Sequence, residues 1–211
     1  MDSYVPRVVD AEIEAATHTA GAVVIRGARA VGKTESVRRV AASELRLDTS
    51  DPRAVLARAQ PSTALEGAVP RLLDEWQVVP ALWNEVRHAV DDRHGPGQFL
   101  LTGSTWPDDA PARHSGAGRF RQVTMRTMSL VETGDSTGTI SLAGLFEDPG
   151  VPLADSGSGL RDVVSRIVRG GGPGGSGPAR VRPWPRPAPT SRTSASTTFP
   201  QSLGRVAIPG A

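Results

Sequence analysis

The chain contains no cysteine. Disulfide frameworks, cysteine-ligated zinc, iron–sulfur clusters and thiol nucleophiles are therefore excluded. No apolar run approaches the roughly 18 residues of a membrane span, and the mixed, acidic N-terminus does not resemble a secretory signal. We expect a cytoplasmic protein with no membrane partner, and its 211 residues suffice for one domain, or one and a half.

Lysine is nearly absent as well. Of the 24 basic residues, 23 are arginine and one is lysine, Lys33. This usage is typical of a GC-rich coding sequence, so the single lysine indicates a position that a wide, planar guanidinium does not fit. Residues 170–211 hold five arginines and no acid, which leaves 19 basic and 22 acidic residues in 1–169, a net charge of −3. A large nucleic-acid footprint on this acidic body is not expected.

Strand-like and helix-like segments alternate along the first 125 residues. Short apolar or β-branched runs predict strands at 22–25, 45–48, 71–74, 98–102 and 119–125. Amphipathic stretches predict helices at 4–18, 33–44, 51–60, 80–93, 129–132, 141–147 and 160–169. This alternation predicts an α/β fold with a parallel sheet.

A complete G-x-x-x-x-G-K-[ST] pattern lies between the strand at 22–25 and the helix that follows it. It reads Gly27-Ala28-Arg29-Ala30-Val31-Gly32-Lys33-Thr34. Glycines at its two ends let successive backbone amides point inward, where they hold phosphate oxygens at the helix N-terminus. Lys33 is predicted to reach the β- and γ-phosphates, and the Thr34 hydroxyl to ligate Mg²⁺. The pattern predicts nucleotide binding.

An acidic pair, Asp74 and Glu75, ends the strand predicted at 71–74. In a phosphate-loop NTPase an aspartate at a strand end holds Mg²⁺, and a glutamate directly after it can deprotonate the attacking water. We therefore predict Asp74 as a metal residue and Glu75 as the general base. An exposed acidic pair at a strand–loop junction is the alternative.

Polar and basic residues further along the chain are candidates to complete such a site. Thr102 or Ser104, at the end of the strand 98–102, is predicted to lie between the γ-phosphate and the water, the alternative being a simple turn. An arginine from the same chain or a neighbour would stabilise transition-state charge; Arg119 is the first choice and Arg113 the second, against solvated loop arginines. The four histidines lack metal-ligand spacing, and Trp76 and Trp83 are predicted to pack in the core.

These segments together resemble a known family. The succession GARAVGKT, PRLLDEWQ, LWNEVR, GQFLLTGS, RHSGAGRF and MRTMSLVETGDSTG is similar to prokaryotic AAA-superfamily ATP-binding proteins of the archaeal-ATPase-like group. The resemblance implies an α/β sandwich with the phosphate-loop strand central in the sheet. It makes 27–34 the Walker A loop, Asp74 and Glu75 the Walker B pair, Thr102 to Ser104 the sensor-1 position, and Arg119 the arginine of a GR element.

The resemblance also implies a domain division. Residues 1–148 would form the P-loop ATPase domain and 149–169 the start of a truncated C-terminal domain of unknown function. Residues 170–211, rich in proline and glycine and without hydrophobic periodicity, are predicted to be disordered. They are either a natural tail or the product of out-of-frame translation, and composition favours the latter.

The leading functional prediction is Mg²⁺-dependent binding of ATP with hydrolysis by water attack on the γ-phosphate. The one lysine lies in the phosphate loop, so the chain has none left for an Asn-Lys-x-Asp guanine motif. This favours ATP over GTP. The alternatives are a nucleotide-binding switch or interaction module with little catalysis, and a non-functional truncated remnant. The expected partners are a nucleotide and either a second copy of the chain or another protein; nucleic acid is not expected.

Overall fold

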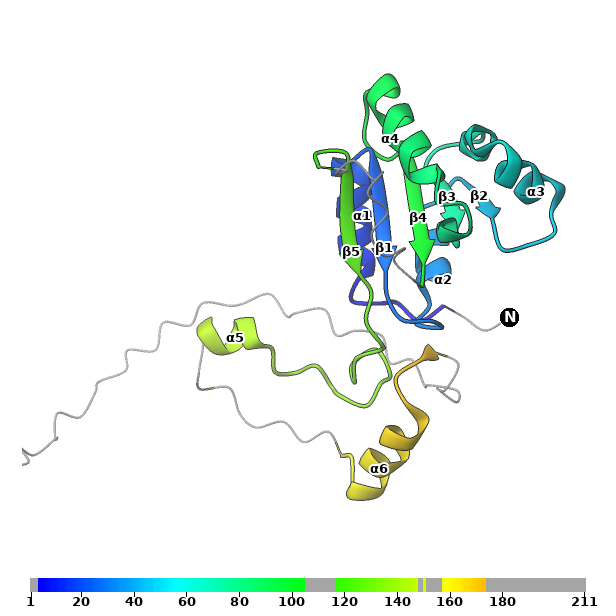
Figure 1. Cartoon of the computed structure of the whole chain (residues 1–211). Coiled ribbons are helices and arrows are strands. Elements are labelled where there is room, and N and C mark those ends of the chain that lie inside the picture. The colour runs from blue at the N-terminus through cyan, green and yellow to red at the C-terminus, as the bar shows by residue number, and fades with distance from the viewer. Residues whose placement is uncertain (1–3, 105–116, 148–149, 151–156, 174–211) are drawn as a thin grey trace, which may run out of the picture.

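The computed structural model describes residues 4–104, 117–147, 150 and 157–173 (Figure 1). Its elements run in the order α1 (Asp10–Thr19), β1 (Ala22–Arg26), α2 (Lys33–Arg38), β2 (Ser43–Arg46), α3 (Pro52–Ala59), the short 3₁₀ turn η1 (Pro61–Leu65), β3 (Arg71–Asp74), the 3₁₀ turn η2 (Trp76–Val78), α4 (Leu82–Arg93), β4 (Phe99–Gly103), β5 (Phe120–Thr124), α5 (Leu142–Glu147) and α6 (Leu160–Arg169). The predicted alternation of strands and helices is confirmed.

The five strands form one parallel sheet in the order β2-β3-β4-β1-β5. β1 pairs with β4 on one side and with β5 on the other, so the strand that precedes the G-x-x-x-x-G-K-T segment is interior. The strands run parallel, so their carboxyl ends all lie at one edge of the sheet. Side chains that follow β1, β3 and β4 therefore meet there.

Helices cover both faces of the sheet, which makes the predicted three-layer sandwich. Alternate residues of the strands point to opposite faces. Val24, Leu73 and Leu101 pack on one face with α3, η1 and α4, whereas Val23, Leu72 and Leu100 pack on the other with α1 and α2. On α4 the apolar stripe Leu82, Val86 and Val90 is buried, as its spacing predicted. The near-continuous apolar strands are typical of a sheet buried on both faces.

Three predicted boundaries and one predicted helix were wrong, and contacts with neighbouring residues or with another strand set the observed ends. α1 begins at Asp10, whose carboxylate accepts from the Arg7 backbone amide and the Tyr4 hydroxyl; residues 4–7 are irregular, and residues 8 and 9 form the turn that leads into the helix. α2 ends at Arg38, not near residue 44, because the backbone amides of Ala42 and Ser43 bond to the Pro70 carbonyl. β2 correspondingly starts at Ser43 rather than residue 45. Residues 129–132 begin a run of turns instead of a helix.

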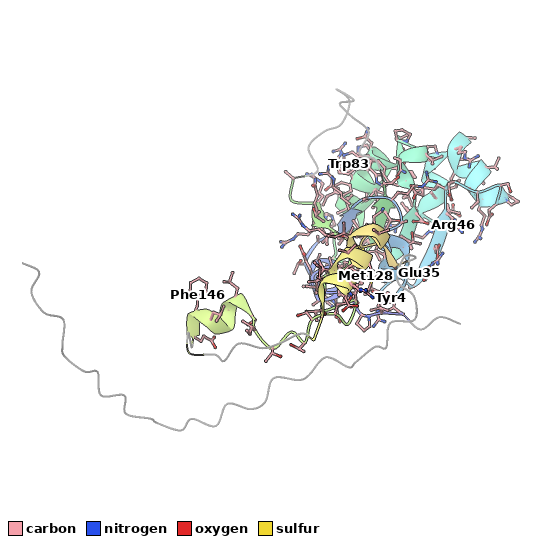
Figure 2. The ribbon with its side chains drawn as sticks, turned by 90° about the horizontal axis from the view of Figure 1, so that it is seen from below. Tyr4, Glu35, Arg46, Trp83, Met128 and Phe146 are labelled. Atoms are coloured by element: carbon pink, nitrogen blue, oxygen red, sulfur yellow. The ribbon has the colours of Figure 1, made fainter. Side chains whose placement is uncertain are left out.

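Two further helices, α5 and α6, follow β5 and lie outside the sandwich (Figure 1). Both agree with the predicted ranges. Phe146 on α5 is 83% exposed, and Figure 2 shows it away from the sandwich. None of the helices in the described part of the chain has the length and apolar character to cross a membrane. The predicted disorder of 170–211 falls mostly on 174–211, which lie outside the described residues.

Candidate functional site

The predicted phosphate loop connects β1 to α2 at the carboxyl edge of the sheet. A side chain on Gly27 would place its Cβ 2.3 Å from the Met125 carbonyl oxygen, so only glycine fits there. Gly32, directly before α2, has φ +96°, and Ala30 has φ +61°. Positive φ is uncommon for a residue with a Cβ. The loop therefore holds an unusual backbone shape that its surroundings must maintain.

Lys33, the one lysine of the chain, is the first residue of α2 and is only 7% exposed. Its Nζ donates to the carbonyl oxygens of Gly27 at 3.0 Å and Ala28 at 2.9 Å, so the ammonium closes the loop onto itself. Burial lowers the pKa of Lys33, and the charges of Glu75 and Asp74 oppose that shift. The ammonium thus bonds to the loop while the acidic pair favours its charged form.

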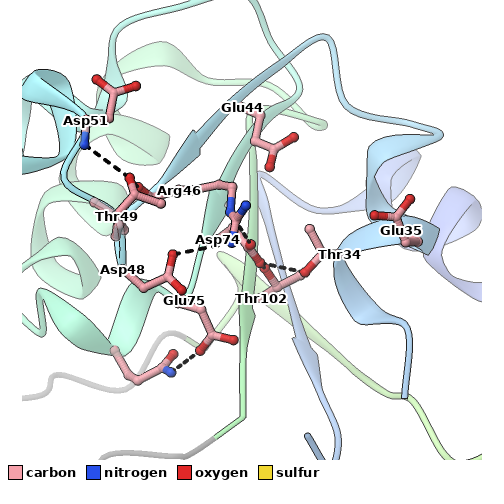
Figure 3. Close-up of polar contacts among 12 residues, drawn as sticks. Thr34, Glu35, Glu44, Arg46, Asp48, Thr49, Asp51, Asp74, Glu75 and Thr102 are labelled. Atoms are coloured by element: carbon pink, nitrogen blue, oxygen red, sulfur yellow. Dashed lines mark hydrogen bonds and ion pairs between the residues drawn. The ribbon is translucent and has the colours of Figure 1, made fainter. Parts of the chain in front are cut away.

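Asp74 joins three elements at this edge (Figure 3). It ends β3 and is 4% exposed. Its Oδ1 accepts from Thr34 Oγ1 at 2.8 Å and from Thr102 Oγ1 at 2.5 Å. The structure therefore brings together the predicted metal residues, Thr34 and Asp74, and one of the two strand-end polar candidates, Thr102. A carboxylate and a threonine hydroxyl are hard oxygen donors that fit Mg²⁺, which keeps several waters and needs few protein ligands.

Glu75 follows Asp74 with φ +55°, in the left-handed region. Its Oε2 accepts from the Gln77 amide nitrogen, as the dashed contact in Figure 3 shows. The other side of that amide, Gln77 Oε1, is buried without a hydrogen-bond partner, close to Gly103. The positive φ separates the Glu75 side chain from that of Asp74, and Gln77 holds its carboxylate in place.

Arg46 is a residue of this region that sequence reasoning missed. It ends β2, in register with Asp74 on β3. Its Nε lies 3.7 Å from Asp74 Oδ2, and its Nη2 lies 3.8 Å from Asp48 Oδ1. The half-exposed guanidinium of Arg46 thus approaches one oxygen of the Asp74 carboxylate, while Thr34 and Thr102 bond to the other oxygen (Figure 3). Only the strand order shows that Arg46 and Asp74 are neighbours, since the segment LRLD does not indicate which strand pairs with it.

Arg119 does not lie with these residues. Its carbonyl accepts from the Ala22 amide, at the amino end of β1, and its guanidinium pairs with Asp91 on α4. β1 runs five residues from there to the loop, roughly 16 Å at a strand's rise. Of the two alternatives for Arg119, this position does not favour the γ-phosphate of its own chain, because β5 starts at the opposite edge of the sheet. Action of Arg119 on a neighbouring copy stays a prediction.

The other candidates divide between exposed and undescribed positions. Ser104 is exposed just after β4. Arg113, the second arginine candidate, lies outside the described residues. His18, His88 and His94 are exposed, and no group of three or more His, Asp or Glu that could hold a metal occurs in the described ranges. The two tryptophans pack in the core, as predicted, with ring centroids 5.6 Å apart.

Comparisons with known proteins bear on the whole arrangement. The family model described as an AAA domain matches residues 19–134. Uncharacterized proteins of Mycobacterium tuberculosis and Mycobacterium bovis are each 34% identical over 130 residues, which cover 60% of this chain and 30% of each relative. The solved structure of PCH-2 from Caenorhabditis elegans covers 70% of this chain and 47% of its own, at 15% identity and a TM-score of 0.31.

The matched model spans more than half of the chain, and it includes the phosphate-loop segment, the β3 and β4 strand ends, and β5. The family implies nucleotide binding. The chain matches under a third of the length of its curated relatives, so their full activities do not transfer. This chain belongs to the AAA domain family of P-loop proteins.

Proposed function

We propose that the protein binds ATP with Mg²⁺ and hydrolyses it by water attack on the γ-phosphate. The observation that carries the proposal is the Asp74 carboxylate, which accepts from both Thr34 and Thr102 beside a loop closed by the single lysine. Backbone amides of 28–34 and Lys33 would hold the phosphates. Mg²⁺, held through Thr34 and Asp74, would neutralise charge on the phosphate oxygens.

The residues around Asp74 have distinct roles in this proposal. Glu75 accepts the proton of the attacking water, since it is the carboxylate next to the metal residue and is itself only half-buried. Gln77 sets the orientation of Glu75 through its amide. Thr102 holds Asp74 by its hydroxyl, and Ser104, exposed directly after β4, would lie between the γ-phosphate and the attacking water. Arg119 would act on the site of a neighbouring subunit.

Calorimetry of Mg²⁺-ATP binding to the full chain tests the proposal. We expect saturable binding in the wild type that Lys33→Ala abolishes. Lys33→Arg is the matched variant, because it keeps the charge and replaces the compact ammonium by a planar fork; we expect it to bind far more weakly than the wild type. Absence of binding by folded wild-type protein, or equal binding by Lys33→Ala, would contradict the proposal.

A second candidate function is a nucleotide-binding switch with little turnover. It is favoured by the position of Arg119, which leaves the chain's own site without that arginine. It is also favoured by the Gln77 amide, which occupies one oxygen of the proposed base. Tight binding of Mg²⁺-ATP with no release of inorganic phosphate would support the switch over the hydrolase.

A further inference from the structure

A buried ion pair lies behind the phosphate loop, on residues far apart in the sequence. Arg7, before α1, pairs through Nε with Glu132 Oε1 at 2.9 Å, and the two side chains are 5% and 6% exposed. Neither residue belongs to the motif at 27–34, and neither has a place in the proposed chemistry. A charge pair removed from water this completely costs desolvation energy, so it needs further hydrogen bonds to be stable.

Those hydrogen bonds lead to the phosphate loop. Arg7 Nη1 donates to the Val31 carbonyl oxygen at 2.6 Å, and Nη2 donates to the Arg126 carbonyl oxygen at 2.9 Å. The planar guanidinium thus joins three acceptors: a carboxylate, the loop, and the segment after β5. A lysine ammonium could bond to one of these acceptors, but it could not present donors in the fixed planar arrangement of the guanidinium.

Glu132 is held as firmly as the arginine. Besides Arg7, it accepts from the backbone amides of Val8 at 2.6 Å and Ser129 at 2.5 Å. Burial raises the pKa of Glu132, but the hydrogen bonds from Ser129, Val8 and Arg7 outweigh it and hold that pKa below its usual range. The carboxylate is therefore charged and fixed at neutral pH, and it fixes the direction of the Arg7 side chain.

The Val31 carbonyl matters because it shares a planar peptide unit with the Gly32 amide. That peptide bond is trans, since the one cis bond in the described residues is Val69–Pro70. In a trans unit the C=O and N–H point in opposite directions. A guanidinium that holds the Val31 oxygen on one side therefore turns the Gly32 N–H to the other side. Gly32 has φ +96° and directly precedes α2, where loop amides receive phosphate oxygens.

We propose that Arg7, oriented by Glu132, is a positioning residue that holds the phosphate loop in its nucleotide-binding shape before nucleotide arrives. This inference rests on the proposed function. A loop that must be ordered on binding adds a conformational cost that a held loop does not have. The unusual backbone at Ala30 and Gly32 is the part of the loop that needs such support.

The experiment compares Arg7→Lys, Arg7→Ala and Glu132→Gln with Arg71→Ala, all in the full chain. Arg71 is the matched control, since the whole residue is buried like Arg7 and its guanidinium likewise donates to a backbone carbonyl, that of Ala64, but at the amino end of β3. We call Arg7 and Glu132 together the clamp. We expect Kd for Mg²⁺-ATP to rise about tenfold or more in the three variants of the clamp. Arg71→Ala should lose thermal stability with Kd unchanged. Arg7→Lys, which keeps a charge for Glu132, should lose affinity while retaining most of its stability.

Hydrogen exchange without nucleotide gives a second readout. Amides of residues 28–32 should exchange at least tenfold faster in Arg7→Lys and Glu132→Gln, whereas amides of α4 should keep the wild-type rate. If the two variants show this faster exchange and the wild type binds no Mg²⁺-ATP, the role of Arg7 and Glu132 in holding the loop would be supported and the proposed function rejected. If Arg7→Lys and Glu132→Gln bind Mg²⁺-ATP as tightly as the wild type, the proposed role of Arg7 is overturned. The same holds if neither substitution changes the exchange rate of amides 28–32. Equal acceleration in α4 would also overturn that role, because it would mark general unfolding.

Discussion

At the scale of single residues, Asp74 and Glu75 have different surroundings although they are adjacent in sequence, and the proposed mechanism gives them different tasks. Asp74 is buried and shared by Thr34 and Thr102, so its carboxylate is occupied with fixed donors. Glu75 turns away through a positive φ and contacts Gln77 instead. In the proposed mechanism, a carboxylate beside Asp74 that does not share its hydrogen-bond partners suits proton transfer.

Glu75→Gln is therefore the first substitution to make. We expect phosphate release to fall by about 10²-fold or more, since the amide cannot accept the proton of water. Binding of Mg²⁺-ATP should stay within a few fold of the wild type, because the phosphate loop and Asp74 are untouched. The measurements are steady-state phosphate release and calorimetry. Glu66→Gln, an exposed carboxylate outside the site, is the control. Turnover at the wild-type rate in Glu75→Gln would disprove its role as base.

At the scale of elements, the apolar stripe of α4 packs on the strands that carry candidate site residues at their ends. Leu82, Val86 and Val90 are buried against the sheet face that also holds Leu73 and Leu101. The same strands carry Asp74 and Thr102 at their ends. Packing of α4 thus stabilises the core around β3 and β4, whose ends carry Asp74 and Thr102. We expect a packing defect in α4 to lower the stability of the fold.

Leu82→Ala tests this packing against a matched leucine. Leu82 is fully buried in α4, whereas Leu56 in α3 is 51% exposed. We expect Leu82→Ala to lower the free energy of unfolding by about 2–5 kcal/mol through lost burial and the cavity left behind. Leu56→Ala should change it by about 0.5 kcal/mol or less. Urea denaturation of both variants measures the difference, and equal losses would show that α4 is not packed as described.

At the scale of the whole molecule, the position of Arg119 raises the question of assembly. It lies at the amino edge of the sheet, paired with Asp91, and its own loop lies at the other edge. If Arg119 serves catalysis, it does so on a second copy of the chain. Such an arginine supplied from a neighbour contributes about 10³-fold or more to turnover.

Mixing two defective variants tests that arrangement. Lys33→Ala should not bind ATP, and Arg119→Ala should bind ATP but turn over poorly. In a mixture, the intact loop of one copy meets the intact arginine of the other, so phosphate release should exceed that of either variant alone and rise with protein concentration. Full turnover by Arg119→Ala alone, or no recovery in the mixture, would contradict a role in a neighbouring site.

Local spacing in the sequence determined the α/β class, the strand ahead of the phosphate loop, and the loop itself, because hydrophobic period and glycine placement are short-range properties. It also pointed to Asp74 and Thr102 as strand-end residues. It did not place element ends such as that of α2, which the Pro70 carbonyl decides.

Only the tertiary structure decided which strand ends are neighbours. The order β2-β3-β4-β1-β5 puts Arg46 beside Asp74 and Arg119 at the far edge. The Arg7–Glu132 pair spans 125 residues of sequence, and no local pattern marks either member. These contacts depend on the register and packing of elements distant along the chain, and such pairings are set by the fold as a whole rather than by any one segment.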